Sequence, residues 1–268
     1  MIDAYYQNNF RYTAGETNED SIRERSRIIL KKLMHFNARG ESLLDVGSGY
    51  GYFLDEAKRG GLTVTGIEPN SSLADISINR SVGTIYQGTL ESYFRKNQKK
   101  RFDFITFIHV IEHMPHPKKI LQMAGKLLSP DGILYIETPN LDSHLYRAEN
   151  NDYTFLTPPD HLWVLSRKSF LNVLGKGYYI KHISTYSYPE HFMGVIKSMI
   201  KRVKNNSDRT AAPEQDQPEW QEVADKGRTF ILSRIKYLLF DKGIASLLYP
   251  LLNLKYYGSI LELYIKKK

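Results

Sequence analysis

The chain has 268 residues, 41% of them hydrophobic, a formal net charge of +8 and no cysteine. This length and apolar content suit one large domain, or one domain with an appendage, and the missing cysteines exclude disulfides and thiolate metal sites. The start of the chain lacks a charged stretch followed by an apolar run, so we expect no signal peptide, and we find no apolar window long enough for a transmembrane helix. The positive charge gathers late in the chain, which fits either an anionic partner surface or a plain solvated face.

The first segment predicts a cap on the domain that follows. It is polar and contains Tyr5, Tyr6 and Tyr12, and residues 21–33 then place apolar side chains at helical spacing. We therefore predict an N-terminal cap segment over residues 1–39, with an amphipathic helix that packs on a sheet. The tyrosines are as compatible with ordinary packing as with ligand contact.

The stretch of residues 43–54, LLDVGSGYGYFL, organises the rest of the prediction. A buried strand ends at Asp45, three glycines alternate with other residues at Gly47, Gly49 and Gly51, and an apolar-periodic helix follows. Glycines permit positive φ and close approach of a ligand, while a helix start offers free N–H groups and a positive dipole end. The spacing departs from the G-x-G-x-x-G pattern that binds a dinucleotide pyrophosphate.

This stretch resembles the first motif of class I S-adenosylmethionine (SAM)-dependent methyltransferases, commonly (D/E)-x-G-x-G-x-G. In that family the loop wraps the methionine part of SAM, and the leading acid lies close to it. The resemblance implies an α/β fold with a doubly wound, seven-stranded, mostly parallel Rossmann-like sheet. It also implies SAM as the cofactor, bound by Asp45, Gly47, Gly49 and Gly51.

Three further residues, at or just after the ends of two predicted strands, are expected to contact SAM. Residues 62–68 form a predicted strand ending in Glu68, roughly twenty residues past the glycine loop, where nucleotide-binding α/β folds place a carboxylate for ribose hydroxyls. An ionised carboxylate can accept two such hydroxyl donors. After the next predicted strand, residues 84–87, the family often has an acidic or amide residue near the adenine; here Thr89 and Leu90 stand there, so we expect a hydroxyl or the backbone to serve instead.

The near-continuous apolar run of residues 102–108 predicts a central parallel strand that is buried on both faces. His109 and Val110 follow at its carboxyl end, where open α/β sheets bind ligands. The block resembles the fourth motif of the same family, in a subgroup with a Leu/Ile-Glu-His signature, here residues 111–113. That subgroup is similar to ubiquinone-pathway and sugar or small-molecule O-methyltransferases, and the resemblance implies that His109 and Val110 lie beside SAM.

Two histidines are candidate catalytic bases. O-methyl transfer requires removal of a hydroxyl proton as the oxygen attacks the methyl sulfonium, and an imidazole with a pKa near 6.5 can accept that proton. His113 is one candidate. His161, which follows Asp160 at the end of a long predicted loop, is the rival. A purely structural hydrogen-bonding role is an equal alternative for each.

The same block contains a metal-like pattern. His109, Glu112 and His113 match H-x-x-E-H, the inverted zincin motif, which needs both histidines on one helical face. Because the first histidine follows a strand, zinc hydrolysis is disfavoured. Some ubiquinone-pathway O-methyltransferases, which this block resembles, hold a divalent cation with Glu-x-x-Glu-His. Here His109 replaces the first glutamate and removes a charge, so we predict no metal, with Glu112 and His113 as the weaker alternative.

The rest of the sheet is expected before residue 189. A helix over 117–128 leads to a strand over 133–137, and a strand over 162–165, a helix over 166–174 and a strand over 178–188 then complete seven strands. The resemblance covers residues 40–188, the predicted SAM-binding domain.

The last part of the chain, residues 189–268, predicts a basic, partly apolar helical appendage. A basic helix reaches about residue 204, a polar linker covers 205–217, and short helices broken by glycine and proline are expected over 229–265. Such a tail can act as a lid, a dimer contact or an interfacial membrane anchor.

The sequence as a whole predicts a SAM-dependent methyltransferase that O-methylates a small-molecule, sugar or lipid-linked hydroxyl. The alternatives are a small-molecule N-methyltransferase and a non-catalytic SAM-binding partner module. A nucleic-acid acceptor is disfavoured, since the Asn/Asp-Pro-Pro-Tyr signature of many amino-methylating enzymes is absent after the fourth strand. We expect a cytoplasmic protein, with peripheral contact at the inner membrane surface and a homodimer left open.

Overall fold

The structure is a computed structural model that describes residues 19–208 and 245–268. Three segments discussed above lie outside these residues. They are the N-terminal stretch with its tyrosines, most of the predicted linker and the first part of the apolar tail. The described chain divides into two compact units. The first contains residues 19–139, 158–184 and 262–268, and the second contains residues 140–157, 185–208 and 245–261.

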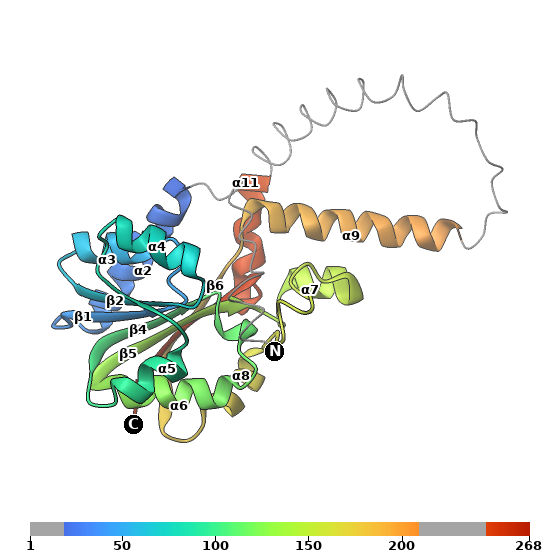
Figure 1. Ribbon diagram of the computed structural model, residues 1–268. Coiled ribbons are helices and arrows are strands. Elements are labelled where there is room, and N and C mark those ends of the chain that lie inside the picture. Colours follow the sequence, from blue (N-terminus) through green and yellow to red (C-terminus); the bar gives the residue numbers. More distant parts are fainter. Residues whose placement is uncertain (1–18, 209–244) are drawn as a thin grey trace. The chain divides into compact units, whose positions relative to one another are not determined.

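A seven-stranded sheet with the order β3-β2-β1-β4-β5-β7-β6 confirms the predicted fold class (Figure 1). The pairs β1–β2, β1–β4, β2–β3 and β4–β5 are parallel. Helices α2, α3 and α4 cover one face and α5, α6 and α8 the other, as in a doubly wound fold. The strands are β1 (Ser42–Val46), β2 (Thr63–Glu68), β3 (Thr84–Gln87), β4 (Phe102–Ile108), β5 (Leu128–Pro139), β6 (Tyr178–Tyr186) and β7 (Ile260–Lys267).

The helices predicted at the start of the chain, after the glycine loop and before β5 are confirmed. The first unit contains α2 (Glu19–Phe36), α3 (Tyr52–Arg59), α4 (Ser71–Asn79), α5 (Leu90–Lys96), η1 (Ile111–His113), α6 (Pro117–Leu127) and α8 (Arg167–Leu174). The second contains α7 (His144–Glu149), η2 (Asn150–Asp152), α9 (Pro189–Asp208), α11 (Ala245–Leu248) and η5 (Tyr249–Tyr256). Over the described ranges, no helix has both the length and the apolar content needed to cross a membrane.

Strand β7 runs antiparallel to β5. Lys267, at its end, donates a hydrogen bond to the carbonyl of Leu128, the first residue of β5. Glu262, near its start, accepts one from Tyr135, further along β5. The last strand of the chain is thus inserted between β5 and β6, and the sheet is mostly rather than wholly parallel.

Two predictions fail at this edge of the sheet. The predicted strand over 162–165 is not formed, and the last part of the predicted helical appendage, residues 260–267, is a strand of the central sheet. The physical reason is burial: residues 260–265 are at most 1% exposed, because they lie between two other strands. An apolar run with one buried glutamate becomes a strand here since Arg25 and Lys32 neutralise that glutamate.

The core explains why α2 packs on the sheet. Its residues Ile29 and Leu33 are fully buried in a cluster with Leu43 of β1, Phe104 of β4 and Tyr135 of β5. Full burial of an aliphatic side chain contributes about 1.5–3 kcal/mol. The helical spacing seen in the sequence therefore marks the face that holds α2 against the strands.

Candidate active site

The glycine loop joins β1 to α3 in a conformation that only glycine adopts readily. Gly47, Gly49 and Gly51 have φ values of 75°, 52° and 76°. Positive φ is costly for residues with a Cβ atom, so the alternating glycines are explained by the backbone itself. The backbone N–H groups of Gly47 and Ser48 donate to the carbonyl of Ile67 at 2.8 and 3.1 Å, which ties the loop to the end of β2.

Asp45 stands before the loop and is buried, with 3% of its surface exposed. It accepts a 2.6 Å hydrogen bond from the Thr106 hydroxyl of the neighbouring strand β4. Burial and the nearby Glu68 charge raise the pKa of Asp45 to about 7, against the opposing effect of Thr106. Thr106 was not predicted as a site residue, and the only signal for it was its polar side chain within the apolar run of β4.

Glu68, at the end of β2, holds the other side of the loop. One carboxylate oxygen accepts from the N–H of Gly49 at 2.8 Å, and the other accepts from the N–H of Asn70 at 2.9 Å. Burial raises the pKa of Glu68. A carboxylate oxygen can accept more than one hydrogen bond, so both oxygens keep acceptor capacity for a ligand hydroxyl. The structure thus brings Glu68 against the loop, and its predicted contact with the ribose hydroxyls stays a prediction.

The loop is closed on one side and open on the other. A Cβ atom built on Gly47 would lie 2.5 Å from Cγ2 of Val110, whereas a Cβ atom on Gly49 would meet nothing within 4 Å. Gly47 therefore packs against the turn after β4, and Gly49 faces open space. This open side lies next to Glu68, whose carboxylate accepts from the N–H of Gly49, and SAM binding there stays a prediction.

A pair of alanine substitutions should separate these two sides. Gly47→Ala should lower the free energy of unfolding by roughly 2–4 kcal/mol, because strain at positive φ adds to the clash with Val110. Gly49→Ala should cost only the strain, about 1–2 kcal/mol, but should also weaken SAM binding. Chemical denaturation and calorimetry measure both effects. Equal destabilisation by the two variants, with equal SAM affinity, would contradict this description of the loop.

Thr89 and Leu90 lie at the start of α5. The Thr89 hydroxyl accepts from the N–H of Ser92 in a capping box, and Leu90 is buried with 1% exposed. The N–H of Gly88 donates to the carbonyl of Glu68 at 3.0 Å, so this helix start lies next to the end of β2. The Thr89 side chain therefore has a capping role, and its predicted contact with the adenine stays a prediction.

His109 begins the turn after β4 with a φ of 53°. Its Nδ1 lies 3.4 Å from a carboxylate oxygen of Glu112, and its Nε2 lies 3.3 Å from one of Glu137. Burial alone would lower the pKa of His109, but the two carboxylates raise it to about 10. The predicted SAM contact of His109 remains untested, and both of its ring nitrogens face protein carboxylates. Because the short η1 follows this left-handed turn, the zincin arrangement is not formed.

The structure brings the two candidate bases together. The ring centroids of His113, at the end of η1, and His161 are 4.8 Å apart. Nδ1 of His113 lies 2.7 Å from the carbonyl oxygen of Asp160, which places the ring proton on Nδ1 and leaves Nε2 as an acceptor. Burial lowers the pKa of His113, against the attraction of Glu112. An imidazole that is neutral near neutral pH is suited to accept a proton.

Glu112, the residue before His113, also contacts the segment that carries His161. Its carbonyl accepts from the N–H groups of Leu162 and Trp163 at 2.9 and 3.1 Å, which fixes the segment carrying His161. Ligand atoms of Glu112, His113 and His161 lie within 4.8 Å of one another, a donor set that divalent transition metals accept. His161 was not part of the metal alternative. The protonated His109 beside Glu112 opposes a second cation, and the absence of a resident metal stays a prediction.

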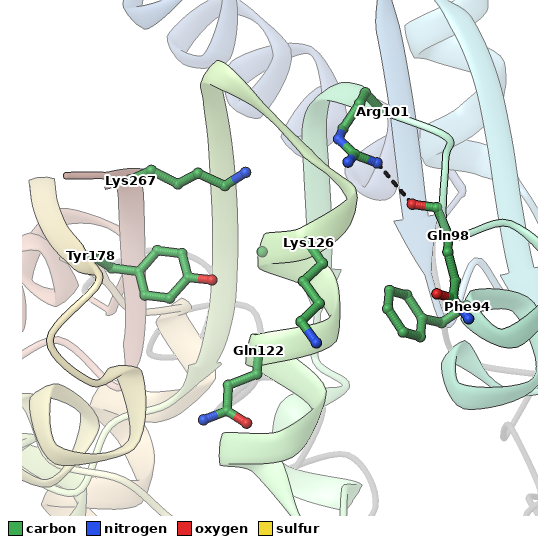
Figure 2. A pocket seen from close by; sticks show the side chains of 8 residues that line it. Phe94, Gln98, Arg101, Gln122, Lys126, Tyr178 and Lys267 are labelled. Atoms are coloured by element: carbon green, nitrogen blue, oxygen red, sulfur yellow. Dashed lines mark hydrogen bonds between the residues drawn. The ribbon is translucent and has the colours of Figure 1, made fainter.

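A separate hollow of about 610 Å³ lies near the amino end of strand β5, away from the carboxyl ends of the parallel strands. Figure 2 shows Lys267 and Tyr178 on one side of it, Arg101, Gln98 and Phe94 on the other, and Lys126 and Gln122 of α6 between them. Lys267 contacts the first residue of β5, whereas Gly47 and His109 follow the last residues of β1 and β4. The candidate active site is therefore assigned to the carboxyl edge of the strands and not to this hollow.

Comparison with known protein families shows which family this chain belongs to. The profile of a family described as a methyltransferase domain matches residues 19–177, more than half of the chain. The chain belongs to this methyltransferase family. The matched region contains the glycine loop, Glu68 and both candidate bases, so it covers the whole candidate site.

Curated relatives match a shorter region of this methyltransferase-family chain. It is 34% identical over 109 residues to the ubiquinone biosynthesis O-methyltransferase of Actinobacillus pleuropneumoniae serotype 5b (strain L20), covering 38% of this chain and 47% of that protein. It is 30% identical over 123 residues to the protein of the same name from Coxiella burnetii (strain Dugway 5J108-111), covering 44% and 52%. The chain thus spans about half the length of the curated relatives it matches.

Solved structures share the fold over nearly the whole chain. A SAM-dependent methyltransferase from Archaeoglobus fulgidus superposes with a TM-score of 0.57 at 18% identity, covering 94% of this chain and 95% of that one. The plantazolicin methyltransferase BamL, in complex with a triazolic desmethylPZN analog and SAH, gives 0.57 at 15% identity, covering 99% and 94%. The predicted class I methyltransferase fold is confirmed.

Proposed function

We propose that this protein transfers the methyl group of SAM to a hydroxyl of a small molecule. The observation that carries the proposal is the glycine loop, open at Gly49 and bordered by Glu68, together with His113, which follows the adjacent strand β4 and whose ring lies 4.8 Å from that of His161. SAM, when bound, supplies the electrophilic methyl sulfonium. The chain supplies the loop and Glu68 to hold it, and Nε2 of His113 to accept the acceptor's hydroxyl proton as the oxygen attacks.

The relatives support oxygen as the methylated atom. Two of them carry the name ubiquinone biosynthesis O-methyltransferase and are 34% and 30% identical to this chain over 109 and 123 residues. A small-molecule, sugar or lipid-linked hydroxyl is the proposed acceptor class. Methylation of a small-molecule nitrogen and SAM binding without catalysis are the alternatives.

The second unit offers a surface for a further contact. Leu247, Leu251 and Leu254 are 79%, 56% and 60% exposed, and Lys255 follows them. Exposed leucines beside lysine favour burial against a protein or an anionic lipid surface. Contact of residues 245–256 with the membrane, or with a second copy of the chain, therefore remains part of the proposal, as does the lipid-linked acceptor. The buried strand β7 is excluded from such a contact.

An assay with methyl-labelled SAM on cell extracts tests the proposal. After fractionation, we expect label in the lipid or small-molecule fraction, on a product whose methyl group resists conditions that release methyl esters. Calorimetry with SAM should show binding to the same preparation. Binding without transfer would favour the non-catalytic alternative, label on an amine would favour N-methylation, and the absence of SAM binding would contradict the proposal altogether.

A further inference from the structure

A series of alternating charges, with two buried glutamates and the partly exposed His109 and Arg25, lies next to the turn that carries His113. Its members come from four elements: Glu112 from η1, His109 from the turn after β4, Glu137 from β5 and Arg25 from α2. The side chains of Glu112 and Glu137 are 1% and 2% exposed. Buried charges are retained at low cost only when each one meets an opposite charge, and this series satisfies that condition.

The series is continuous in distance. The His109 ring lies 3.4 Å from Glu112 on one side and 3.3 Å from Glu137 on the other. The second oxygen of Glu137 accepts a 2.8 Å hydrogen bond from the Arg25 guanidinium. The same guanidinium nitrogen donates to Glu262 of β7 at 2.6 Å. Arg25 is thus the point at which helix α2 connects to the groups beside the candidate bases.

Both carboxylates that Arg25 holds have further partners. Glu262 also accepts from Lys32 and from the Ser184 hydroxyl, at 3.1 and 2.7 Å. Glu137 lies 3.3 Å from the His109 ring and accepts a hydrogen bond from Tyr135. Because Glu137 contacts both Arg25 and His109, loss of Arg25 would strengthen the attraction between Glu137 and His109 and weaken the contact between His109 and Glu112.

We infer that Arg25 is a positioning residue of the methyl-transfer site, acting through Glu137 and His109 on the turn that carries His113. His109 holds a left-handed conformation that a residue with a Cβ atom adopts only at a cost of about 1–2 kcal/mol. Its N–H group, which donates to the Glu137 carbonyl at 2.9 Å, and the two carboxylates stabilise this conformation. The inference rests on the proposed function, since it concerns the geometry of the same site.

Replacement of Arg25 tests the inference. In Arg25→Ala, kcat for methyl transfer should fall by roughly 10–100-fold, the loss expected from a small displacement of a base, while the Kd for SAM changes less than about twofold. Free guanidinium should restore part of kcat, because it can occupy the vacated position between Glu137 and Glu262. A purely structural role would not give this rescue at unchanged SAM affinity. Arg25→Lys keeps the charge with a single donor group and should lose less activity.

Arg27→Ala is the matched control, because Arg27 lies on the same helix, is 58% exposed and pairs with Glu56 instead. It should leave kcat unchanged with or without guanidinium. Equal kcat in Arg25→Ala and Arg27→Ala would overturn the inference. Two other results would also overturn it. One is a loss of kcat in Arg25→Ala that parallels the loss of folded protein and is not restored by guanidinium. The other is full activity in Arg25→Lys together with an Arg25→Ala protein that does not fold.

A second measurement separates this inference from the proposed function. In the NMR spectrum of histidine-labelled protein, the His113 ring signal should shift in Arg25→Ala and return toward its wild-type position with guanidinium. It should not shift in Arg27→Ala. If the wild-type protein binds SAM but transfers no methyl group, the catalytic proposal fails, and the NMR result alone decides whether Arg25 positions His113. An unchanged His113 signal in Arg25→Ala overturns the inference.

Discussion

In His113→Ala, methyl transfer is expected to fall by roughly 10²–10⁴-fold, the usual contribution of a general base, while SAM affinity stays nearly unchanged. The reason is local: the Asp160 carbonyl holds the proton of His113 on Nδ1, and burial lowers the pKa of the ring, so Nε2 is the ring nitrogen that can accept a proton. Single-turnover kinetics with SAM and the acceptor found in extracts measure the chemical step. Calorimetry on the same variant measures SAM binding.

His161→Ala and His116→Ala complete this experiment. His161 lies against His113 and is the rival base, whereas His116 is exposed and serves as the control that should keep full activity. A larger loss in His161→Ala than in His113→Ala would reverse the two roles. If His113→Ala and His161→Ala both keep full activity, alignment of donor and acceptor carries the reaction and the assignment of a base is wrong. Loss of activity in wild-type protein after chelation, with recovery on adding a divalent cation, would instead favour the metal alternative at these residues.

Features carried by neighbouring residues could be predicted from the sequence. The loop from Asp45 to Gly51 combines a strand end, three glycines and a helix start within a few residues, and each element constrains the next. Glu68 was found because the distance from the loop to the second strand end is nearly constant in this fold. Both predictions depend on local order along the chain; the structure places these residues together, and their contacts with SAM stay predictions.

Features that depend on distant parts of the chain could not be predicted in the same way. Strand β7 pairs with β5, which lies far away from it in the sequence. Its buried Glu262 is neutralised by Arg25, 237 positions away. The run of residues 162–165 is as apolar as a strand, but its first N–H groups donate to the Glu112 carbonyl instead of a sheet partner. Arg25 itself has the sequence context of an ordinary exposed helical arginine, so only the folded structure reveals its contacts with Glu137 and Glu262.

Glu68→Ala is expected to weaken SAM binding by about 1–3 kcal/mol, the range for a lost hydrogen bond to a charged group. Two effects contribute. The carboxylate is the predicted acceptor for the ribose hydroxyls, and it also holds the N–H of Gly49, the residue at the open side of the loop. Calorimetry with SAM measures the change, and thermal unfolding shows whether the fold stays intact. Glu24→Ala, which removes an exposed acid on α2, is the control and should leave SAM affinity unchanged.

Glu68→Gln distinguishes the two effects. Glutamine has nearly the same shape and can still accept a hydrogen bond from Gly49 through its carbonyl oxygen, but its amide nitrogen cannot accept one from Asn70 or from a ribose hydroxyl. If the main role of Glu68 is to hold the loop, glutamine should restore most of the affinity lost in alanine. If the main role is ribose binding, glutamine should bind SAM almost as weakly as alanine, while methyl donors without free ribose hydroxyls lose nothing further. Unchanged affinity in both variants, with an intact fold, would remove Glu68 from the site.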